Sequence, residues 1–362
     1  MTGLLFMMNV GDGLEIFFKI PSSPQIDGGK VALLDFGSSQ GIGTALGGYW
    51  RGIQKTKRSP DVFILSHFHV DHYNGLFGKP PLSLSRVYFP IIPKIRENSI
   101  ISDQFALALL SINYYIAYKV LGNGNIPIDQ DFINLLQKLN HGSFISKPLS
   151  RGDTFTIGSL DFEVLWPPRE ITIEDAPAQR IIKALKAFWE AIDTEPQLRA
   201  IYRELRYLEQ DILEKLIEPI ETKLHGEENE LKIPTKYMDY SYLRVYENMH
   251  PTVRKANAEI RRAANHLSLA FVSSADNSIL FLGDLESPEI RKLRQDIQDQ
   301  KYCILITPHH GTHWDSTLFG VRSEYALSSV GPKLIRNVRI EFDHISNIHY
   351  KTFCSGDTQL SF

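Results

Sequence analysis

The sequence predicts a mixed α/β (α+β) fold in which several buried strands carry a metal-binding site at their ends. Short apolar runs bounded by polar residues are typical of buried strands, and they occur at 31–37, 62–65, 279–282 and 303–307. Each run ends in, or is followed within a few residues by, an aspartate or a histidine. Stretches with helical spacing separate the strands, among them a long one at 102–121.

Length and composition place the chain among ordinary soluble globular proteins. Its 362 residues suffice for one large domain or two smaller ones. The hydrophobic and charged fractions, 43% and 22%, are those of a globular protein with a sizeable core. The formal net charge of −3 argues against a strongly basic nucleic-acid-binding protein, although a local basic patch stays open.

We expect no membrane-spanning segment and a cytoplasmic location. No apolar run approaches the ~20 residues that a membrane span needs, and the most apolar helical stretch, 105–120, is interrupted by polar residues. The first residues lack the basic segment and the small-residue cleavage site of a signal peptide. The two cysteines, Cys303 and Cys354, lie far apart in the sequence, which suits a reducing compartment.

The strongest chemical signal is the segment 66–72, Ser-His-Phe-His-Val-Asp-His, directly behind an apolar strand. Alternate side chains of an extended strand point the same way, so His67 and His69 can converge on one point. Asp71 and His72 follow a turn and can face a second point nearby. Imidazole nitrogens and carboxylate oxygens are ligands that Zn²⁺ prefers, and they also suit Mn²⁺ and Fe.

Two further strand ends offer ligands of the same kinds. Asp284 follows the apolar run 279–282, and the pair His309-His310 follows the run 303–307. A site with two metal ions needs a bridging carboxylate and a further histidine. The ends of these two strands supply both residue types.

The string His-x-His-x-Asp-His behind an apolar strand resembles the signature of the metallo-β-lactamase-fold hydrolases. Four further strings are similar to the hydrolase domain of bacterial DNA-uptake competence proteins and their soluble relatives: Asn-x-x-Ser-Leu at 265–269, Phe-Leu-Gly-Asp-Leu-Glu at 281–286, Pro-His-His-Gly-Thr at 308–312, and a terminal Tyr-Lys-Thr…Gly-Asp. Those relatives include nucleases, phosphodiesterases and a phosphorylcholine esterase. The resemblance implies a four-layer αββα sandwich with the metal site at one edge.

The same resemblance implies two divalent metal ions, with zinc expected and manganese or iron as alternatives. His67 and His69 would hold the first ion. Asp71 and His72 would hold the second ion, and Asp284 would bridge the two. Asp71 would thereby also take part in catalysis.

The sequence follows the family pattern less closely at the remaining histidine ligands. The resemblance assigns the last one to His310 rather than His309, because the residue before the glycine usually ligates. For the first ion, many relatives have a histidine before a Gly-Ser-Leu-like strand start, where this chain has Asn265-His266. Either His266 ligates, or Asn265 lines the site and leaves the first ion with an open position. A surface position is the simpler explanation for His141, which lies at a helix end.

Three residues have expected roles outside the ligand set. In the family, an aspartate at the place of Asp35 braces the metal-binding loop, and a simple turn aspartate is the alternative. Thr312 and His313 directly follow the His-His-Gly string and are placed to contact a substrate. His313 is a candidate acid for the leaving group, with an ordinary loop histidine as the alternative.

Residues 169–264 change the character of the chain, because they are rich in charged residues, leucine and isoleucine at helical spacing, with few glycines. We predict a catalytic domain formed by 1–168 and 265–362, with 169–264 as a helical insertion that caps it. Helices are expected at 178–192, 197–217 and 251–264. The insertion could bind a protein partner, form a dimer surface or serve as structural cover. We expect a variant with 172–258 replaced by a flexible linker to keep its metals and to change its substrate preference.

The expected activity is metal-dependent hydrolysis of a phosphodiester in a nucleic acid or a nucleotide. Two ions ~3.5–4 Å apart would lower the pKa of a bridging water, and the resulting hydroxide would attack phosphorus. The same hydroxide would serve a carboxylic ester, an amide or a thioester, so these substrates are an alternative. A metal-stabilised scaffold that binds a partner is a third possibility, but a structural zinc site is closed and needs only four ligands.

Overall fold

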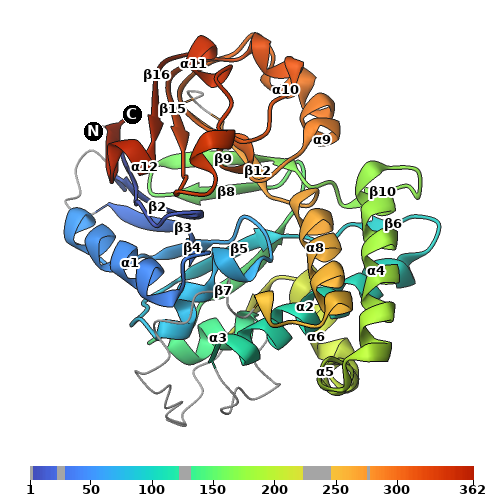
Figure 1. Ribbon diagram of the computed structural model, residues 1–362. Helices are drawn as coiled ribbons and strands as arrows, with labels where there is room; N and C mark the ends of the chain where they lie inside the picture. The colour runs from blue at the N-terminus through green and yellow to red at the C-terminus, as the bar shows by residue number, and fades with distance from the viewer. Residues whose placement is uncertain (1–2, 23–28, 122–131, 223–245, 275–277) are drawn as a thin grey trace.

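A computed structural model describes residues 3–22, 29–121, 132–222, 246–274 and 278–362 of the chain (Figure 1). Within these residues two β-sheets lie face to face, and helices cover the outer face of each sheet. This arrangement is a four-layer αββα sandwich, and the predicted fold class is confirmed.

The first sheet has eight strands among the described residues, in the order β11-β7-β5-β4-β3-β2-β1-β17. Their bounds are β1 Leu4–Met7, β2 Gly13–Ile20, β3 Lys30–Ser38, β4 Val62–Ile64, β5 Arg86–Pro90, β7 Ile145–Leu149, β11 Ile220–Glu221 and β17 Thr358–Ser361. Strands β3, β4, β5 and β7 run parallel. The segment 66–72 therefore leaves the sheet at the edge where these parallel strands all end.

The second sheet has seven strands in the described part of the chain, in the order β16-β15-β14-β13-β12-β9-β8. Their bounds are β8 Thr154–Ile157, β9 Leu160–Trp166, β12 Ala270–Ser273, β13 Ile279–Phe281, β14 Lys301–Ile306, β15 Arg322–Ser328 and β16 Ser346–Lys351. Strands β13 to β16 run parallel, so the loops after β13 and β14 leave at a common edge. Two short strands, β6 (Lys94–Ile95) and β10 (Glu170–Ile171), pair separately.

The central strands are apolar throughout because both of their faces are buried. Leu33 of β3 packs into the outer core beneath the helices, whereas Ala32 and Leu34 pack between the two sheets. On the opposite sheet, Phe271 of β12 faces the inter-sheet core and Ala270 faces the second outer core. This alternation fixes which side chains reach each layer.

Helices on the outer side of the first sheet are α1 Ile42–Thr56, α2 Ser99–Leu121, α3 Phe132–Leu139, α4 Ala176–Thr194, α5 Pro196–Tyr207, α6 Glu209–Ile217 and α8 Pro251–Asn265. Short helices α9 (Ser287–Lys292), α10 (Arg294–Ile297) and α11 (Phe342–Ile345) cover the second sheet. A last short helix, α12 (Thr352–Ser355), connects β16 to β17. Three of these helices lie close to their predicted ranges of 102–121, 178–192 and 251–264.

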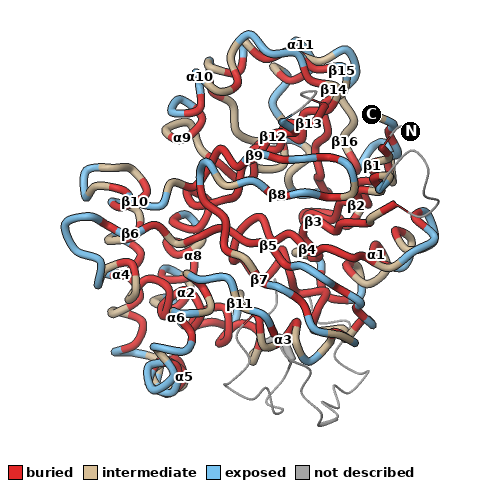
Figure 2. Tube along the Cα trace, turned by 180° about the vertical axis from the view of Figure 1, so that it is seen from behind, coloured by how far each residue is buried: buried red, intermediate tan, exposed pale blue. Residues whose placement is uncertain are grey.

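The helical block shares its hydrophobic core with the first sheet. Ile181 of α4 and Ile260 of α8 belong to the same buried cluster as Leu33 of β3, and Figure 2 shows these helices buried along their inner sides. The single helix expected at 197–217 is wrong, because the backbone leaves helical geometry at Leu208 between α5 and α6. The break lets the apolar faces of both helices enter one core. The stretch 223–245 of this block lies outside the described residues.

Helix α2 is the one described helix that is long and apolar enough to cross a membrane by length and composition. This differs from the expectation that no segment would reach that length. In the structure, 78% of the relevant window, Ser99–Lys119, is buried within the protein. Its partners include α4, α5 and α8, so its apolar surface is covered by other helices.

Candidate metal centre

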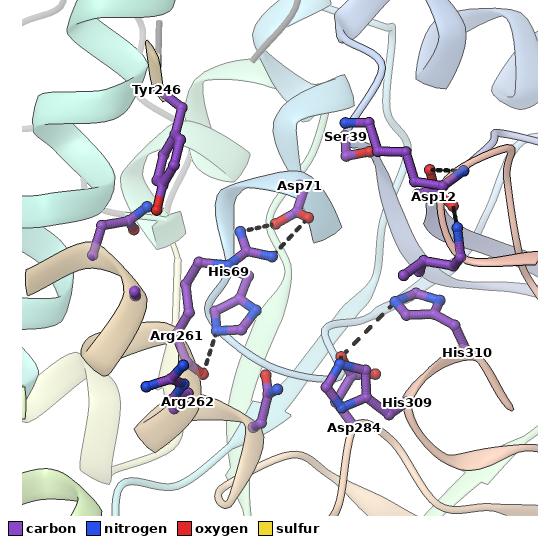
Figure 3. Close-up of a pocket in the computed structure, with 15 residues that line it drawn as sticks. Asp12, Ser39, His69, Asp71, Tyr246, Arg261, Arg262, Asp284, His309 and His310 are labelled. Atoms are coloured by element: carbon purple, nitrogen blue, oxygen red, sulfur yellow. Dashed lines mark hydrogen bonds and ion pairs between the residues drawn. The ribbon is translucent and has the colours of Figure 1, made fainter. Parts of the chain in front are cut away.

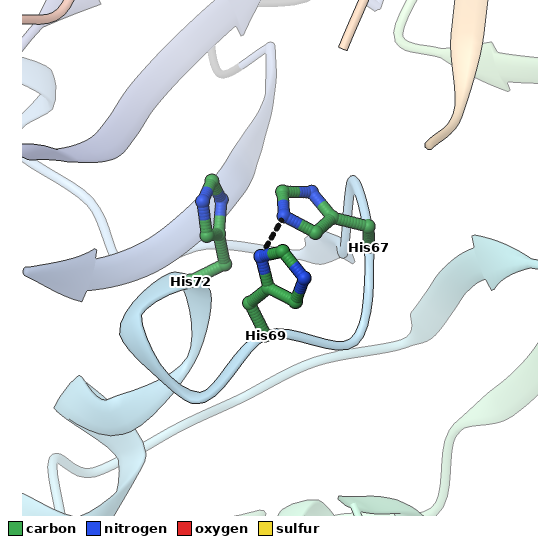
Figure 4. A group of neighbouring side chains, drawn as sticks. All are labelled: His67, His69 and His72. Atoms are coloured by element: carbon green, nitrogen blue, oxygen red, sulfur yellow. Dashed lines mark hydrogen bonds between the residues drawn. The ribbon is translucent and has the colours of Figure 1, made fainter. Parts of the chain in front are cut away.

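Three histidines converge at the carboxyl end of β4. His67, His69 and His72 are buried, and each offers a ring nitrogen within 4.8 Å of the others (Figure 4). His67 Nε2 lies 2.7 Å from His69 Nδ1. The segment 70–72 is a single 3₁₀ turn, which brings His72 back beside the first two histidines. Such a group of nitrogens can hold one metal ion.

A second group shares His72 with the first. Together with Asp284 and His310 it again places three ligand atoms within 4.8 Å of one another. Asp284 Oδ2 lies 3.8 Å from His67 Nε2 and 3.8 Å from His310 Nε2. The carboxylate of the second group therefore lies beside a histidine of the first group as well.

The loop after β14 has an unusual backbone. His309 and His310 have φ values of 48° and 59°, and Gly311 has a φ of 84°. A non-glycine residue at positive φ is held against its own preference. The His309 amide donates to the Gly283 carbonyl at 2.9 Å, which ties this loop to the one that carries Asp284. Both strand ends are thus fixed relative to each other.

His309 approaches the site as well as His310 does, which the sequence did not predict. His309 Nε2 lies 3.9 Å from Asp284 Oδ2. Its Nδ1 is buried without a hydrogen-bond partner among the described residues. Burial lowers the pKa of His309 to about 4, although the Asp284 charge opposes this shift. The ring is therefore neutral at pH 7, and it has a lone pair that can bind a metal ion.

Asp35 orients the histidine segment from beneath. Its carboxylate accepts hydrogen bonds from the Ser66 amide (2.6 Å) and the Ser66 hydroxyl (2.5 Å), and lies 2.7 Å from His72 Nδ1. Asp35 itself is fully buried, with a φ of 54°. Because His72 Nδ1–H donates to Asp35, Nε2 is the nitrogen left for a metal ion, which would displace the proton on it. This placement matches the bracing role expected for Asp35.

The environment of the histidines sets their charge. Burial lowers the pKa of His67 well below its usual value, and neighbouring histidines lower it further. His69 shows the same downward shift, first through burial and then through the charge of Arg261. Burial alone would lower the pKa of His72, but the charge and hydrogen bond of Asp35 raise it to about 9. His67 and His69 are therefore neutral, the form that binds metal ions, whereas His72 must give up its second proton when it binds one.

Helix α8 contacts this centre through Arg261. The Arg261 guanidinium donates to both Asp71 oxygens, at 2.7 and 3.0 Å (Figure 3). Its backbone carbonyl lies 2.8 Å from His69 Nε2. A carbonyl only accepts, so His69 carries its proton on Nε2 and presents Nδ1 toward His67. Burial raises the pKa of Asp71, but the Arg261 charge and hydrogen bonds outweigh it and hold the pKa well below the usual range.

The structure places His266 apart from both groups of candidate ligands. Its Nδ1 lies 2.8 Å from Glu289 Oε1 and its Nε2 lies 3.4 Å from Glu286 Oε2. Burial would lower the pKa of His266, but these two carboxylates raise it to about 9. Asn265 instead lines the cavity at the metal centre, and its side-chain oxygen is buried without a partner among the described residues. Asn265 therefore lines the cavity, and His266 is paired with the two glutamates.

Thr312 and His313 stand behind the site rather than within the cavity. The Thr312 hydroxyl donates to the His309 carbonyl at 2.7 Å. The ring of His313 stacks on that of His309, with centroids 4.2 Å apart and planes 12° apart. Neither residue lines the cavity. In this structure both residues contact His309. Their role expected from the sequence was to contact a substrate.

A cavity of about 430 Å³ opens onto the candidate ligands (Figure 3). One wall carries His69, Asp71, Asp284, His309 and His310. The other residues that line it include Asp12, Ser39, Tyr246, Asn257, Arg261, Arg262, Asn265 and Lys333. The helical block therefore supplies a cationic wall to the same cavity. Helical patterning of the sequence alone does not distinguish Arg261 and Arg262 from the other basic residues of the block.

No protein-family model matches the chain, and no curated protein matches it in sequence. Its structure is similar to the metallo-beta-lactamase fold protein YhfI from Bacillus subtilis, with a TM-score of 0.38 and 10% identity over 98% of this chain and 99% of that one. It is similar to a diphosphatase of the PhnP family, with a TM-score of 0.37 and 10% identity over 99% and 98% of the two chains. A long-form RNase Z from yeast matches 84% of this chain and 32% of its own, at 7% identity and a TM-score of 0.34. These TM-scores are below 0.5, so the proposals below rest on the residues of the site.

Proposed function

We propose that this protein is a metal-dependent hydrolase that cleaves a phosphodiester in a nucleic acid or a nucleotide. The observation that carries the proposal is the pair of ligand groups, His67-His69-His72 and His72-Asp284-His310, with Asp284 between them. We further propose two divalent ions, zinc first, with manganese or iron as alternatives.

The donor set fits metal ions of this kind. His69 and His72 each donate one ring proton to a protein oxygen, so the other nitrogen is the one that would coordinate, in His72 after loss of its second proton. Asp284 is surrounded by three imidazoles and is held ionised, because their effect outweighs the burial that would raise its pKa. When bound, divalent ions would supply an activated water at neutral pH and positive charge for the oxygens of the scissile group.

The cavity wall supports an anionic substrate. Arg261, Arg262 and Lys333 line the cavity beside the ligand groups, and guanidinium groups match phosphate oxygens in shape and charge. The chain has a formal net charge of −3, so this cationic wall is a local feature rather than a general one. The resemblance of 265–269 and 281–286 to DNA-uptake competence proteins points to the same substrate class.

Two alternatives predict different results. Carboxylic esters, amides and thioesters need the same activated water but no cationic wall. A partner-binding scaffold needs a closed metal site, whereas here Asp284 and both loop histidines face a cavity. A phosphodiester substrate would use both the activated water and the cationic wall of the cavity.

The test combines metal analysis with a substrate panel. Purified protein should retain or take up divalent metal, measured by mass spectrometry. It should hydrolyse bis-p-nitrophenyl phosphate faster than p-nitrophenyl acetate, and an Asp284→Ala variant should lose both metal and activity. An exposed-residue variant, His141→Ala, is the matched control for substitution of a histidine or acid outside the cavity. Hydrolysis of the acetate alone would favour the carboxylic ester alternative, and metal binding without hydrolysis would favour the scaffold.

A further inference from the structure

The carboxylate of Asp71 is fully engaged by a residue of the helical block. Arg261 reaches it from α8 with two hydrogen bonds, at 2.7 and 3.0 Å. Paired, two-pronged contacts between a guanidinium and a carboxylate are among the strongest ion pairs in proteins. The Asp71 side chain is 8% exposed, so this pair is largely shielded from water on the carboxylate side. A cation that binds Asp71 must therefore compete with Arg261.

The sequence assigned this same carboxylate to the second metal ion. The second ligand group of the structure, His72-Asp284-His310, does not include Asp71. The guanidinium carries the positive charge that an ion would otherwise bring to Asp71. With Arg261 in place, the second ion is left with the three ligands of that group.

Arg261 can leave Asp71 toward the cavity. Its side chain is 31% exposed, and both residues line the same cavity. Its backbone carbonyl accepts the hydrogen bond from His69, a contact that does not involve the guanidinium and can persist while the side chain turns. A phosphate group in the cavity is such an anion.

We propose that Arg261 is an exchangeable counter-ion, which neutralises Asp71 in the substrate-free protein and moves to the phosphate of a bound substrate. Asp71 is then released to bind the second metal ion. The inference rests on the proposed function, because it assigns a role in phosphodiester binding to that same cavity. It couples substrate binding to completion of the metal centre, so phosphate and the second ion bind with positive cooperativity. By thermodynamic linkage, each must then strengthen the binding of the other by the same factor.

The experiment measures metal affinity rather than turnover. Metal-free protein is titrated with Mn²⁺, and free Mn²⁺ is followed by electron paramagnetic resonance, with and without dimethyl phosphate as a phosphodiester that resists hydrolysis. In the wild type, we expect the second Mn²⁺ to bind more weakly than the first, and dimethyl phosphate to tighten it by about tenfold. In Arg261→Met, the second Mn²⁺ should bind about tenfold more tightly without dimethyl phosphate, and the phosphate effect should vanish.

The neighbouring arginine provides the matched control. Arg262 lies on the same helix and lines the same cavity, but pairs with Glu259 at 2.9 Å rather than with Asp71. Arg262→Met should leave the affinity for the second Mn²⁺ unchanged. Arg261→Lys, which keeps the charge but loses the two-pronged contact, should give an intermediate affinity and guards against misfolding of the methionine variant.

The outcomes separate this inference from the proposed function. Equal affinity for the second Mn²⁺ in wild type, Arg261→Met and Arg261→Lys would overturn the inference, even if hydrolysis of phosphodiesters were observed. The same gain in Arg262→Met as in Arg261→Met would also overturn it, because the effect would then be general charge. A wild-type protein that binds no divalent metal would overturn both proposals.

Discussion

Asp35 and His72 form a fully buried pair, with Asp35 Oδ2 2.7 Å from His72 Nδ1. This contact fixes the ring of His72, the residue shared by both candidate ligand groups. We predict that Asp35→Asn lowers metal affinity by about 10- to 100-fold, as loss of a partner that orients a ligand commonly does. Asparagine tolerates the positive φ at this position, so the substitution tests the charge rather than the backbone.

The measurement for Asp35 is a competition between the protein and a chelating dye for zinc. Asp161→Asn, at an exposed position, is the control and should bind like the wild type. Wild-type affinity in Asp35→Asn would mean that this aspartate only shapes the turn.

Metal binding should stabilise the protein through Asp284. Its carboxylate lies 3.8 to 3.9 Å from three imidazoles, His67, His309 and His310. A ligand that binds only the folded state raises its stability, by an amount that grows with the logarithm of the ligand concentration once the site is saturated. We expect excess zinc to raise the melting temperature of the wild type, and a chelator to reverse the rise. Asp284→Ala should melt at one temperature in both conditions; a full zinc response in this variant would exclude Asp284 as a ligand.

Sequence patterns located the ligand groups because each ligand follows directly on a buried strand. The apolar run before His67 and the one before Asp284 both end at a sheet edge. Parallel strands bring such ends together whatever their separation in the chain, so the site could be anticipated. The sequence pattern that predicts His310 as a ligand also contains its neighbour His309. Only the backbone geometry of the loop reveals that both side chains turn toward Asp284.

Arg261 could not be predicted in the same way. It lies 190 residues from Asp71 in the chain and sits in a helix with many other basic residues. Helical spacing tells which face of α8 is buried, but not which strand end that face meets. Only the packing of α8 over the histidine segment selects Arg261.

A serine, a histidine and an aspartate form a chain of hydrogen bonds behind the His309-His310 loop. Ser328 Oγ lies 2.8 Å from His349 Nε2, and His349 Nδ1 lies 2.6 Å from Asp343 Oδ1. The arrangement resembles a hydrolytic triad, but Ser328 is fully buried and also contacts Thr307 at 2.8 Å. No substrate can reach that hydroxyl, so its role is to hold the strand ends under the loop.

We therefore predict that Ser328→Ala destabilises the fold by about 1–3 kcal/mol, because it leaves His349 Nε2 buried without a partner. Urea denaturation measures the loss, with Ser355→Ala at an exposed position as the control. The folded wild type should not react with a fluorophosphonate probe. Labelling of Ser328 would contradict the structural role and reopen serine hydrolysis as an activity.

Glu15 should make the stability of the protein depend on pH. It is fully buried, and neither carboxylate oxygen has a hydrogen-bond partner among the described residues. Burial raises its pKa well above the usual 4.5, although Arg51 opposes the shift. The folded state thus favours the protonated acid, so its contribution to stability is present below pH 4.5 and is lost as pH rises through the folded-state pKa.

Replacing Glu15 with glutamine should remove that loss. We expect the stability of Glu15→Gln relative to the wild type to be greater at pH 8 than at pH 5, because glutamine cannot ionise, whereas the buried carboxyl of Glu15 loses stability as pH rises through its raised pKa. Urea denaturation across this pH range provides the measurement, and Glu163→Gln, at an exposed position, should show no such trend. A constant difference at all pH values would show that Glu15 does not titrate.

The packing of the helical block changes what its removal should do. From the sequence, a variant with 172–258 replaced by a linker was expected to keep its metals. In the structure, α4 and α8 pack against α2 and share one core with the first sheet, so the deletion would uncover that core and remove part of α8. We now predict that the shortened chain fails to fold.

A single substitution can test this dependence without deletion. Ile260 of α8 is 1% exposed, one residue before Arg261. Ile260→Ala should lower the free energy of unfolding by about 2–5 kcal/mol, as for other large-to-small changes in a core. Ile340→Ala, at a position that is 64% exposed, should change it by less than about 0.5 kcal/mol. If Ile260→Ala melts like Ile340→Ala, the block is an independent cap, and the linker variant should fold and bind metal after all.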